Sequence, residues 1–125
     1  VHTTGAGKVL LSEMAHIDII EILRRKGLPS LTPQSIIDST RFFDELEIVK
    51  KQGFALDDEE CELGARCIAV PVRNHTGRVI ASLSISGPTS RLTNQRIRKL
   101  IPIVKDYGGQ MSRALGYEEA IIKIK

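Results

Sequence analysis

The residues best placed to do chemistry are small polar side chains on two predicted strands. The stretch 61–88 alternates apolar with small or polar residues on both sides of a turn at residues 74–77, a pattern typical of a β-hairpin. Cys67, Ser84 and Ser86 then share one face of the hairpin. A row of hydroxyls and a thiol suits the floor of a small polar pocket, because small side chains leave room for a ligand and can hydrogen-bond to it. The alternative is a strand face exposed to solvent, where serine is common.

The register of this hairpin follows from the length assumed for its turn. A four-residue loop pairs Arg73 with Arg78 and places Cys67 opposite Ser84, with Ser86 beyond. A slip of one residue would exchange the two faces and remove the pairing of Cys67 with Ser84. The opposite face is then apolar and holds Ile68, Val70, Val72, Val79, Ala81, Leu83 and Ile85.

A second candidate site lies at the start of a helix predicted over residues 2–14. Either Thr3 or Thr4 can cap this helix, which leaves the backbone amides of Gly5 and Ala6 in its first turn. Those amides have no partner inside the helix, and the helix dipole favours an anion there. A carboxylate could therefore be held without any charged side chain. The alternative is a glycine-rich helix start that permits tight packing.

The same segment does not form a phosphate-binding loop, although Gly7 and Lys8 suggest one. That motif requires a glycine five residues before Gly7, where His2 stands. It also requires a serine or threonine after the lysine, where Val9 stands.

Four consecutive acids at residues 57–60 follow a short predicted strand at residues 54–56. Neighbouring carboxylates repel one another, so we expect this run to form a solvated loop or a helix start rather than a metal site. Asp57, at the end of the strand, is the acid that could point towards the pocket and accept a hydrogen bond from a ligand.

Helical spacing of apolar residues predicts three further helices. We expect them over residues 18–26, from a cap at Ser35 or Asp38 to residue 51, and over residues 93–116. Pro102 lies inside the last helix and predicts a kink or an early break there. Residues 117–125 carry no clear pattern.

The composition describes a single domain, or part of one, of an ordinary soluble protein. The chain of 125 residues is 42% hydrophobic and 26% charged, with a net charge of +3 and no run of eighteen apolar residues. Its dense basic groups at residues 24–26 and 96–99 are best explained as exposed helix ends, and no DNA-reading motif accompanies them. Cys61 and Cys67 lack the spacing of a zinc site, so we expect free thiols, no metal and no cofactor.

Several segments resemble one known family in the same order. They are residues 3–8, 53–60, 62–72 and 84–88, and they resemble the effector-binding domain of IclR-type bacterial transcription regulators. The resemblance implies an α+β fold with a GAF-like antiparallel sheet flanked by helices and a long C-terminal helix. It also implies that residues 1–125 are a fragment of a single effector-binding domain, because the family places a DNA-binding winged helix-turn-helix domain, and the first helix and strands of this domain, ahead of it. The family's effector site falls on Gly5, Ala6, Asp57, Cys67, Ser84 and Ser86.

We therefore expect a ligand-sensing domain of a cytoplasmic regulator, not an enzyme. Its effector would be a small organic acid (an oxo, hydroxy or sugar acid), which alters DNA binding by the full-length protein. We expect self-association as a dimer or tetramer and no contact with a membrane. DNA would be bound only by the N-terminal domain. Two alternatives are a ligand-free dimerisation module and a cysteine-dependent enzyme. The latter lacks an activating base, because His2, His16 and His75 have no motif partner.

Overall fold

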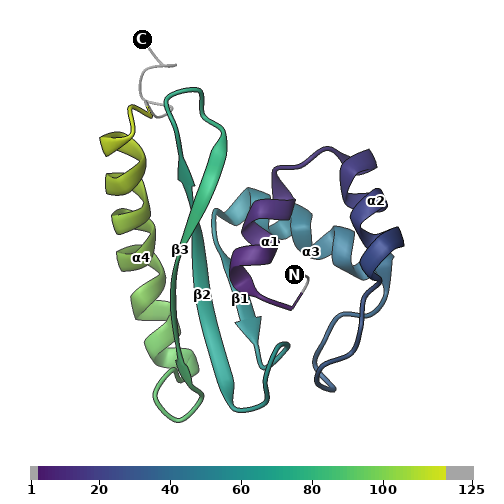
Figure 1. Cartoon of the computed structure of the whole chain (residues 1–125). Helices are drawn as coiled ribbons and strands as arrows, with labels where there is room; N and C mark the ends of the chain where they lie inside the picture. Colours follow the sequence, from purple (N-terminus) through teal and green to yellow (C-terminus); the bar gives the residue numbers. More distant parts are fainter. Residues whose placement is uncertain (1–2, 118–125) are drawn as a thin grey trace.

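The structure, a computed structural model, describes residues 3–117 and shows an α+β fold (Figure 1). Its described elements are α1 (Gly5–Ser12), α2 (His16–Lys26), α3 (Ser39–Gln52), β1 (Ala55–Asp58), β2 (Ala65–Arg73), β3 (Val79–Pro88) and α4 (Asn94–Ala114). The predicted fold class is confirmed, as is the long C-terminal helix. Residues 118–125, for which the sequence suggests no pattern, lie outside the described part.

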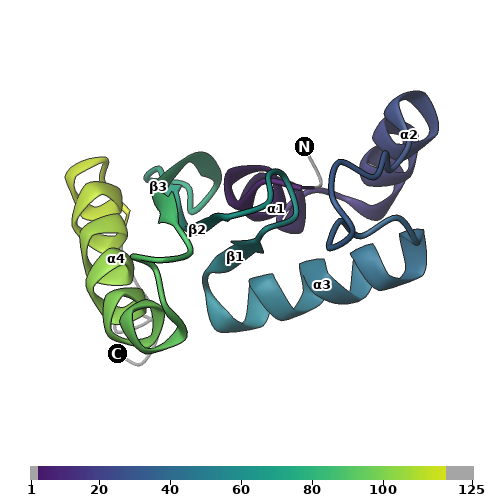
Figure 2. The same ribbon diagram turned by 90° about the horizontal axis from the view of Figure 1, so that it is seen from below.

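The elements form layers around a sheet of three antiparallel strands in the order β1-β2-β3. Helix α4 covers one face of the sheet, and α1 packs on the other face and against α3 (Figures 1 and 2). Helix α2 lies at the far end of the α1–α3 layer, away from the sheet (Figure 2). Within residues 3–117 no helix is both long and apolar enough to cross a bilayer.

Capping residues fix where the helices begin and end. Thr4 caps α1 by accepting a hydrogen bond from the amide of Gly7 at 3.0 Å, and Asp38 caps α3 through Thr40 at 2.9 Å. Gly53 ends α3 in the left-handed conformation (φ 81°), which glycine adopts without strain. Helix α1 ends at Ser12, two residues before the predicted end, and α2 begins two residues earlier than predicted.

Helix α4 runs unbroken through Pro102, so the predicted early break is wrong. Proline removes one backbone donor, the partner of the carbonyl of Arg98. Pro102 and Arg98 are both exposed, so water can hydrogen-bond to that carbonyl. Packing of the buried face of α4 against the sheet, through Ile97 and Val104, then outweighs the lost hydrogen bond.

The β2–β3 hairpin has the predicted faces but not the predicted register. Arg73 pairs with Val79 rather than Arg78, and a bulge at Val72/Arg73 then adds a second shift, so that Val72 pairs with Ala81 and Cys67 with Ser86. Two shifts of one residue preserve the alternation, because side chains repeat with a period of two. Val79 alone changes side: it packs on the α1 face with Val9 and Ala69 instead of on the α4 face.

Helix α4 approaches the sheet very closely at Gly108. A β-carbon added there would lie 2.6 Å from Cγ2 of Val70 and 3.4 Å from the carbonyl oxygen of Pro71. Val70 is 1% exposed, and its branched side chain has little freedom to move aside. Glycine at this position therefore sets the distance between the helix and β2.

We predict that Gly108→Ala destabilises the chain by about 1 kcal/mol or more. Alanine gains about 1 kcal/mol in helix propensity over glycine, but overpacking at a tight contact costs about 1–3 kcal/mol. In a Val70→Ala background the clash disappears, and Gly108→Ala should become neutral or stabilising. Urea unfolding of the parent chain, the two single variants and the double variant measures the coupling free energy between residues 70 and 108. A Gly108→Ala variant more stable than the parent chain would contradict the assignment.

Candidate functional site

The predicted polar residues lie on the sheet face that carries α1. The strand register arranges this face in two rows of three residues across β1, β2 and β3, which are Ala55–Ala69–Ser84 and Asp57–Cys67–Ser86. The hairpin therefore brings Cys67, Ser84 and Ser86 together, as the sequence predicts, and β1 adds Asp57 to the same surface.

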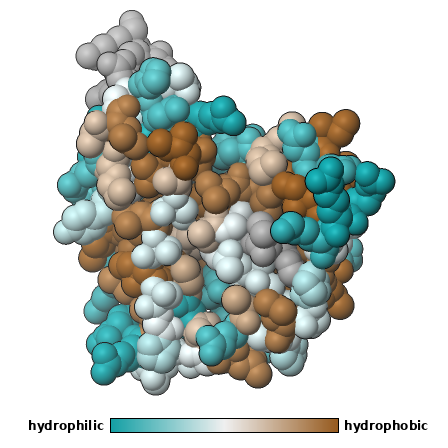
Figure 3. Space-filling model, viewed as in Figure 1, coloured by the Kyte–Doolittle hydropathy of each residue, from teal (hydrophilic) through white to brown (hydrophobic). Residues whose placement is uncertain are grey.

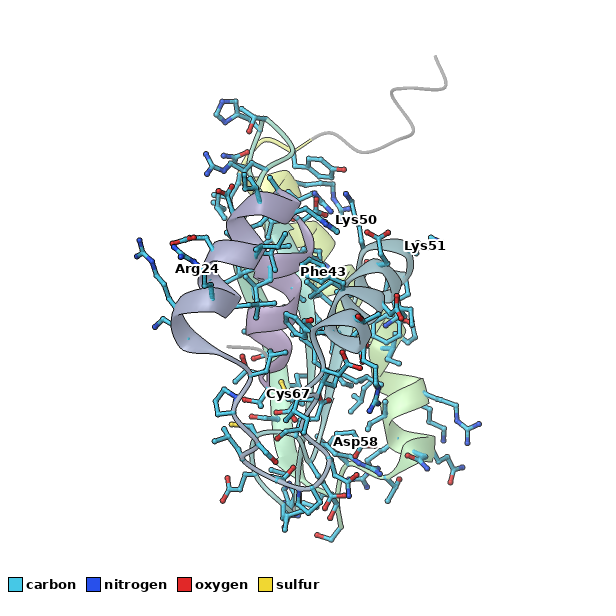
Figure 4. The ribbon with its side chains drawn as sticks, turned by 90° about the vertical axis from the view of Figure 1, so that its right-hand side faces the viewer. Arg24, Phe43, Lys50, Lys51, Asp58 and Cys67 are labelled. Carbon is cyan, nitrogen blue, oxygen red and sulfur yellow. The ribbon has the colours of Figure 1, made fainter. Side chains whose placement is uncertain are left out.

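The first turn of α1 contacts this polar surface. A β-carbon on Gly5 would lie 3.0 Å from Cβ of Ala69 and 3.4 Å from Sγ of Cys67. The backbone amide of Gly5 donates a hydrogen bond to the Cys67 sulfur, and Ser84 is a hydrogen-bond partner of the same sulfur. Figure 4 shows Cys67 at the N-terminal end of α1. Only a residue without a side chain lets the helix come this close to β2.

The surface is covered by α1 where it contacts β2 and is open to solvent on β3. Gly5 is buried, and Ala6 and Cys67 are half-buried, whereas Ser84 and Ser86 on β3 are exposed. A ligand could therefore lie on the two serines with one end against the tip of α1. The available groups are backbone amides, hydroxyls and a thiol, which are neutral donors and acceptors suited to a small oxygen-rich anion.

Asp57 has a structural role within the same surface. Its Oδ1 accepts hydrogen bonds from the amides of Glu60 at 2.9 Å and Cys61 at 3.3 Å, and the residue is 8% exposed. This carboxylate therefore shapes the turn after β1. Burial raises the pKa of Asp57, although the two amides and Lys8 act in the opposite direction.

Lys8 and Glu60 form a buried ion pair that the sequence analysis missed. The Lys8 side chain is fully buried, and its Nζ lies 2.7 Å from Oε2 of Glu60 and 2.8 Å from the carbonyl oxygen of Leu56. A second carboxylate, that of Glu45 on α3, lies 3.8 Å away. The pair ties α1 to the turn between β1 and β2. The one available signal was that Lys8 is the sole charged residue in α1.

The run of acids at residues 57–60 is thus not the solvated loop that the sequence suggests. Asp57 and Glu60 are buried, and Glu59 is half-buried, while Asp58 is exposed and pairs with Arg66 at 2.8 Å. The hydroxyls of Thr32 and Ser35, from the segment between α2 and α3, donate to the Glu59 and Glu60 carbonyls respectively. Repulsion between neighbouring acids is relieved because their side chains point to different partners.

The electrostatics of the pair are set by burial. Desolvation raises the pKa of Glu60 above its ordinary value, even though its hydrogen bond with Lys8 and the Lys8 charge favour the ionised form. Within the described residues its second carboxylate oxygen, Oε1, is buried without a hydrogen-bond partner. This arrangement is costly for an anion, so its stability depends strongly on Lys8.

Cys67 does not have the environment of a nucleophile. Burial raises the pKa of its thiol, although the hydrogen bonds with Ser84 and Gly5 act in the opposite direction. An activated cysteine needs a lowered pKa or an adjacent base. In residues 3–117 no group of three or more His, Cys, Asp or Glu residues could hold a metal ion.

We predict that Lys8→Met destabilises the chain by roughly 3–5 kcal/mol at pH 7.5, because it leaves the Glu60 carboxylate buried without its counter-ion. Loss of Lys8 raises the pKa of Glu60 further, so the folded variant binds a proton more readily than the folded parent. Its stability relative to the parent should improve as pH falls, by about 1.4 kcal/mol per pH unit between the two folded pKa values.

Urea unfolding at pH 7.5 and pH 5 measures both effects. The control is Arg24→Met, which removes an exposed pair with Glu21 (side chains 75% and 43% exposed) and should change stability by about 0.5 kcal/mol or less at either pH. A cost of Lys8→Met that is equal at the two pH values would argue against Glu60 as the group that titrates.

Proteins of similar sequence are regulators of transcription. The chain is 37% identical over 116 residues to the HTH-type transcriptional repressor AllR of Escherichia coli strain K12, a match that covers 93% of this chain and 43% of AllR. It is 36% identical over 121 residues to AllR of Salmonella paratyphi A, with 97% and 44% covered. The chain thus spans less than half the length of these relatives. Both relatives are named as repressors of transcription.

Solved structures of similar fold also come from proteins named as transcription regulators. The C-terminal domain of the E. coli regulator KdgR superposes with a TM-score of 0.84 at 35% identity, covering 93% of this chain and 71% of that one. A double mutant of the PobR inducer-binding domain from Acinetobacter, in complex with 3-hydroxybenzoic acid, gives 0.85 at 37% identity, with 89% and 66% covered. Thermotoga maritima IclR gives 0.85 at 34% identity, with 93% and 47% covered.

The family of this chain follows from these matches and from a family model. The model described as the C-terminal part of the bacterial transcriptional regulator IclR matches residues 1–113, which is most of the chain. The resemblance seen in the sequence motifs is therefore confirmed, and the chain belongs to the IclR C-terminal family of bacterial transcriptional regulators.

Proposed function

We propose that this chain senses a small organic acid and thereby controls DNA binding by the full-length, cytoplasmic regulator. The ligand lies on the surface formed by Cys67, Ser84 and Ser86, with its carboxylate at the first turn of α1. Gly5 and Ala6 supply backbone amides, and Asp57 lies at the β1 end of the same surface, where an acceptor would select a ligand hydroxyl.

The observation that carries this proposal is the approach of α1 to the sheet. The Gly5 amide and the Ser84 hydroxyl both reach the Cys67 sulfur, so a helix tip and a two-stranded floor meet at one point. The similar PobR domain was solved with 3-hydroxybenzoic acid, a molecule with one carboxylate and one hydroxyl. The groups on our surface have the chemistry to bind such a ligand.

The signal would arise from a shift between two arrangements of the domain. A ligand changes DNA affinity only if it binds one arrangement better than the other. Contact with both α1 and β3 would favour the arrangement in which these two elements lie close together. Each neutral hydrogen bond contributes about 1 kcal/mol net, so moderate affinity is expected for a small ligand.

We predict that at least one small oxo, hydroxy or sugar acid stabilises the chain against heat. At a hundredfold excess over Kd the gain is about 2.7 kcal/mol, which corresponds to a rise in Tm of roughly 3–6 °C for a domain of this size. Ser84→Ala should remove most of this rise, because it deletes a hydroxyl from the floor. The measurement is a thermal melt of each protein against a panel of such acids.

Ser39→Ala is the matched control, because Ser39 is exposed on α3, on another element of the fold. It should leave the ligand-induced rise unchanged. A folded chain that responds to no acid, or a response that persists undiminished in Ser84→Ala, would refute the site.

A second function, self-association, is favoured by an apolar groove between β3 and α4. The groove has a volume of about 430 Å³, and its apolar lining includes Leu83, Ile85, Ile103, Tyr107 and Met111. Ile103 is 49% exposed and Tyr107 58% exposed, and Figure 3 shows hydrophobic residues gathered on this side of the molecule. Large exposed apolar patches are typical of protein interfaces. The partner we propose for this groove is a second copy of the chain.

Tyr107→Glu should therefore shift the chain towards monomer, because it places a charge in the groove. Sedimentation velocity over a range of concentrations measures the shift. Ile20→Glu, on the exposed side of α2 (52% exposed), is the control and should leave the distribution unchanged. A parent chain that is monomeric at all concentrations would contradict this second function.

A further inference from the structure

A hollow at the start of α4 is lined by positive charges and belongs to neither surface described so far. Its lining consists of Ser90, Arg91, Thr93, Gln95, Arg96 and Lys99, and its volume is about 570 Å³. None of these residues belongs to the proposed effector site or to the apolar groove. Three cations, two hydroxyl groups and one amide therefore surround one space.

These cations have no acidic partner among the described residues. Within residues 3–117 the side chains of Arg91, Arg96 and Lys99 form no ion pair and no hydrogen bond, whereas Arg66 and Arg73 each pair with a carboxylate. The sequence explains why. Residues 63–105 contain eight lysines and arginines and not one aspartate or glutamate. Positive charge is thus concentrated on exposed side chains without an acidic neighbour, and the resulting positive potential attracts anions.

The backbone that carries the cations is held in place from several sides. Leu92, next to Arg91, is 6% exposed and packs with Ile68 and Ile97. Its carbonyl accepts a hydrogen bond from the Arg66 guanidinium at 2.9 Å, and its amide donates to the carbonyl of Pro88 at 2.8 Å. A fixed loop reduces the entropy that a ligand would otherwise lose on binding.

Helix geometry places two of the cations on one side of α4. Arg96 and Lys99 are three residues apart and so are neighbours on the helix surface. Arg98 lies between them in sequence but projects in another direction and does not line the hollow. The cations surround a concavity rather than forming a stripe, which suits a small ligand better than a long polyanion.

We propose that this hollow is a second binding site, for a small anion that carries several charges, of the phosphate or polycarboxylate class. Arginine binds such groups through its planar fork of donors, and lysine adds a compact charge. The hydroxyls of Ser90 and Thr93 supply further hydrogen bonds. This site is independent of the proposed organic-acid effector and uses different residues.

The test is a titration of the chain with sodium pyrophosphate, and in a parallel arm with citrate, at constant ionic strength maintained with sodium chloride. Melting temperature and isothermal titration calorimetry are both recorded. We expect saturable binding of one anion per chain. Arg96→Gln and Lys99→Gln should each weaken it about tenfold, because each removes a charged hydrogen-bond donor.

Arg98→Gln is the matched control, because it removes the same charge from the same helix outside the hollow. Binding that is unchanged in Arg98→Gln but weakened in the other two variants supports the site, and the arm that binds more tightly identifies the anion class. Binding that fails to saturate, or that weakens equally in all three variants, would overturn it. So would displacement of pyrophosphate by non-specific duplex DNA at equal phosphate concentration, since the hollow would then be part of a nucleic-acid surface. Circular dichroism shows that each variant is folded.

Discussion

A buried cation, the ammonium group of Lys8, determines how α1 meets β1 and the turn that follows it. Lys8 lies in the middle of α1, and it bonds to the Glu60 carboxylate and the Leu56 carbonyl beneath it. One side chain therefore joins the helix to β1 and to the turn that follows. Removing either charge would leave the other buried and unpaired, which is far more costly than the loss of an exposed pair. The position of α1 on the sheet, and with it the candidate ligand surface, depends on this pair.

A second constraint is the absence of a side chain at two points of close contact. Gly5 lets the tip of α1 rest on Cys67 and Ala69, and Gly108 lets α4 approach Val70 from the other face. The middle strand is thus held between two helices that both need glycine to come so close. The same approach that packs α1 also directs the Gly5 amide at the Cys67 sulfur. Packing and the proposed ligand site therefore share one contact.

Acidic and basic residues are unevenly distributed along the chain. Residues 13–62 hold twelve acids, of which Glu60 is in the buried pair with Lys8 and others are in exposed pairs, while the charged residues of 63–105 are all lysines and arginines. Two of those cations, Arg66 and Arg73, reach back to Asp58 and Glu13. Those at the start of α4 have no such partner within the described residues, and this difference separates a positive hollow from the hydroxyl-lined surface, whose one charged side chain is that of Asp57. The two proposed sites would let one regulator respond to two chemically different ligands.

The sequence by itself determined the element types, two candidate caps each for α1 and α3, and the division of the hairpin into an apolar and a polar face. These features depend on short-range rules: a cap acts over three residues, and a strand alternates with a period of two. Tertiary structure alone decided the bulge at Val72/Arg73, the continuity of α4 through Pro102 and the burial of Asp57 and Glu60. Each depends on a partner distant in sequence, such as Lys8, 52 residues from Glu60, and no local pattern specifies such a pairing.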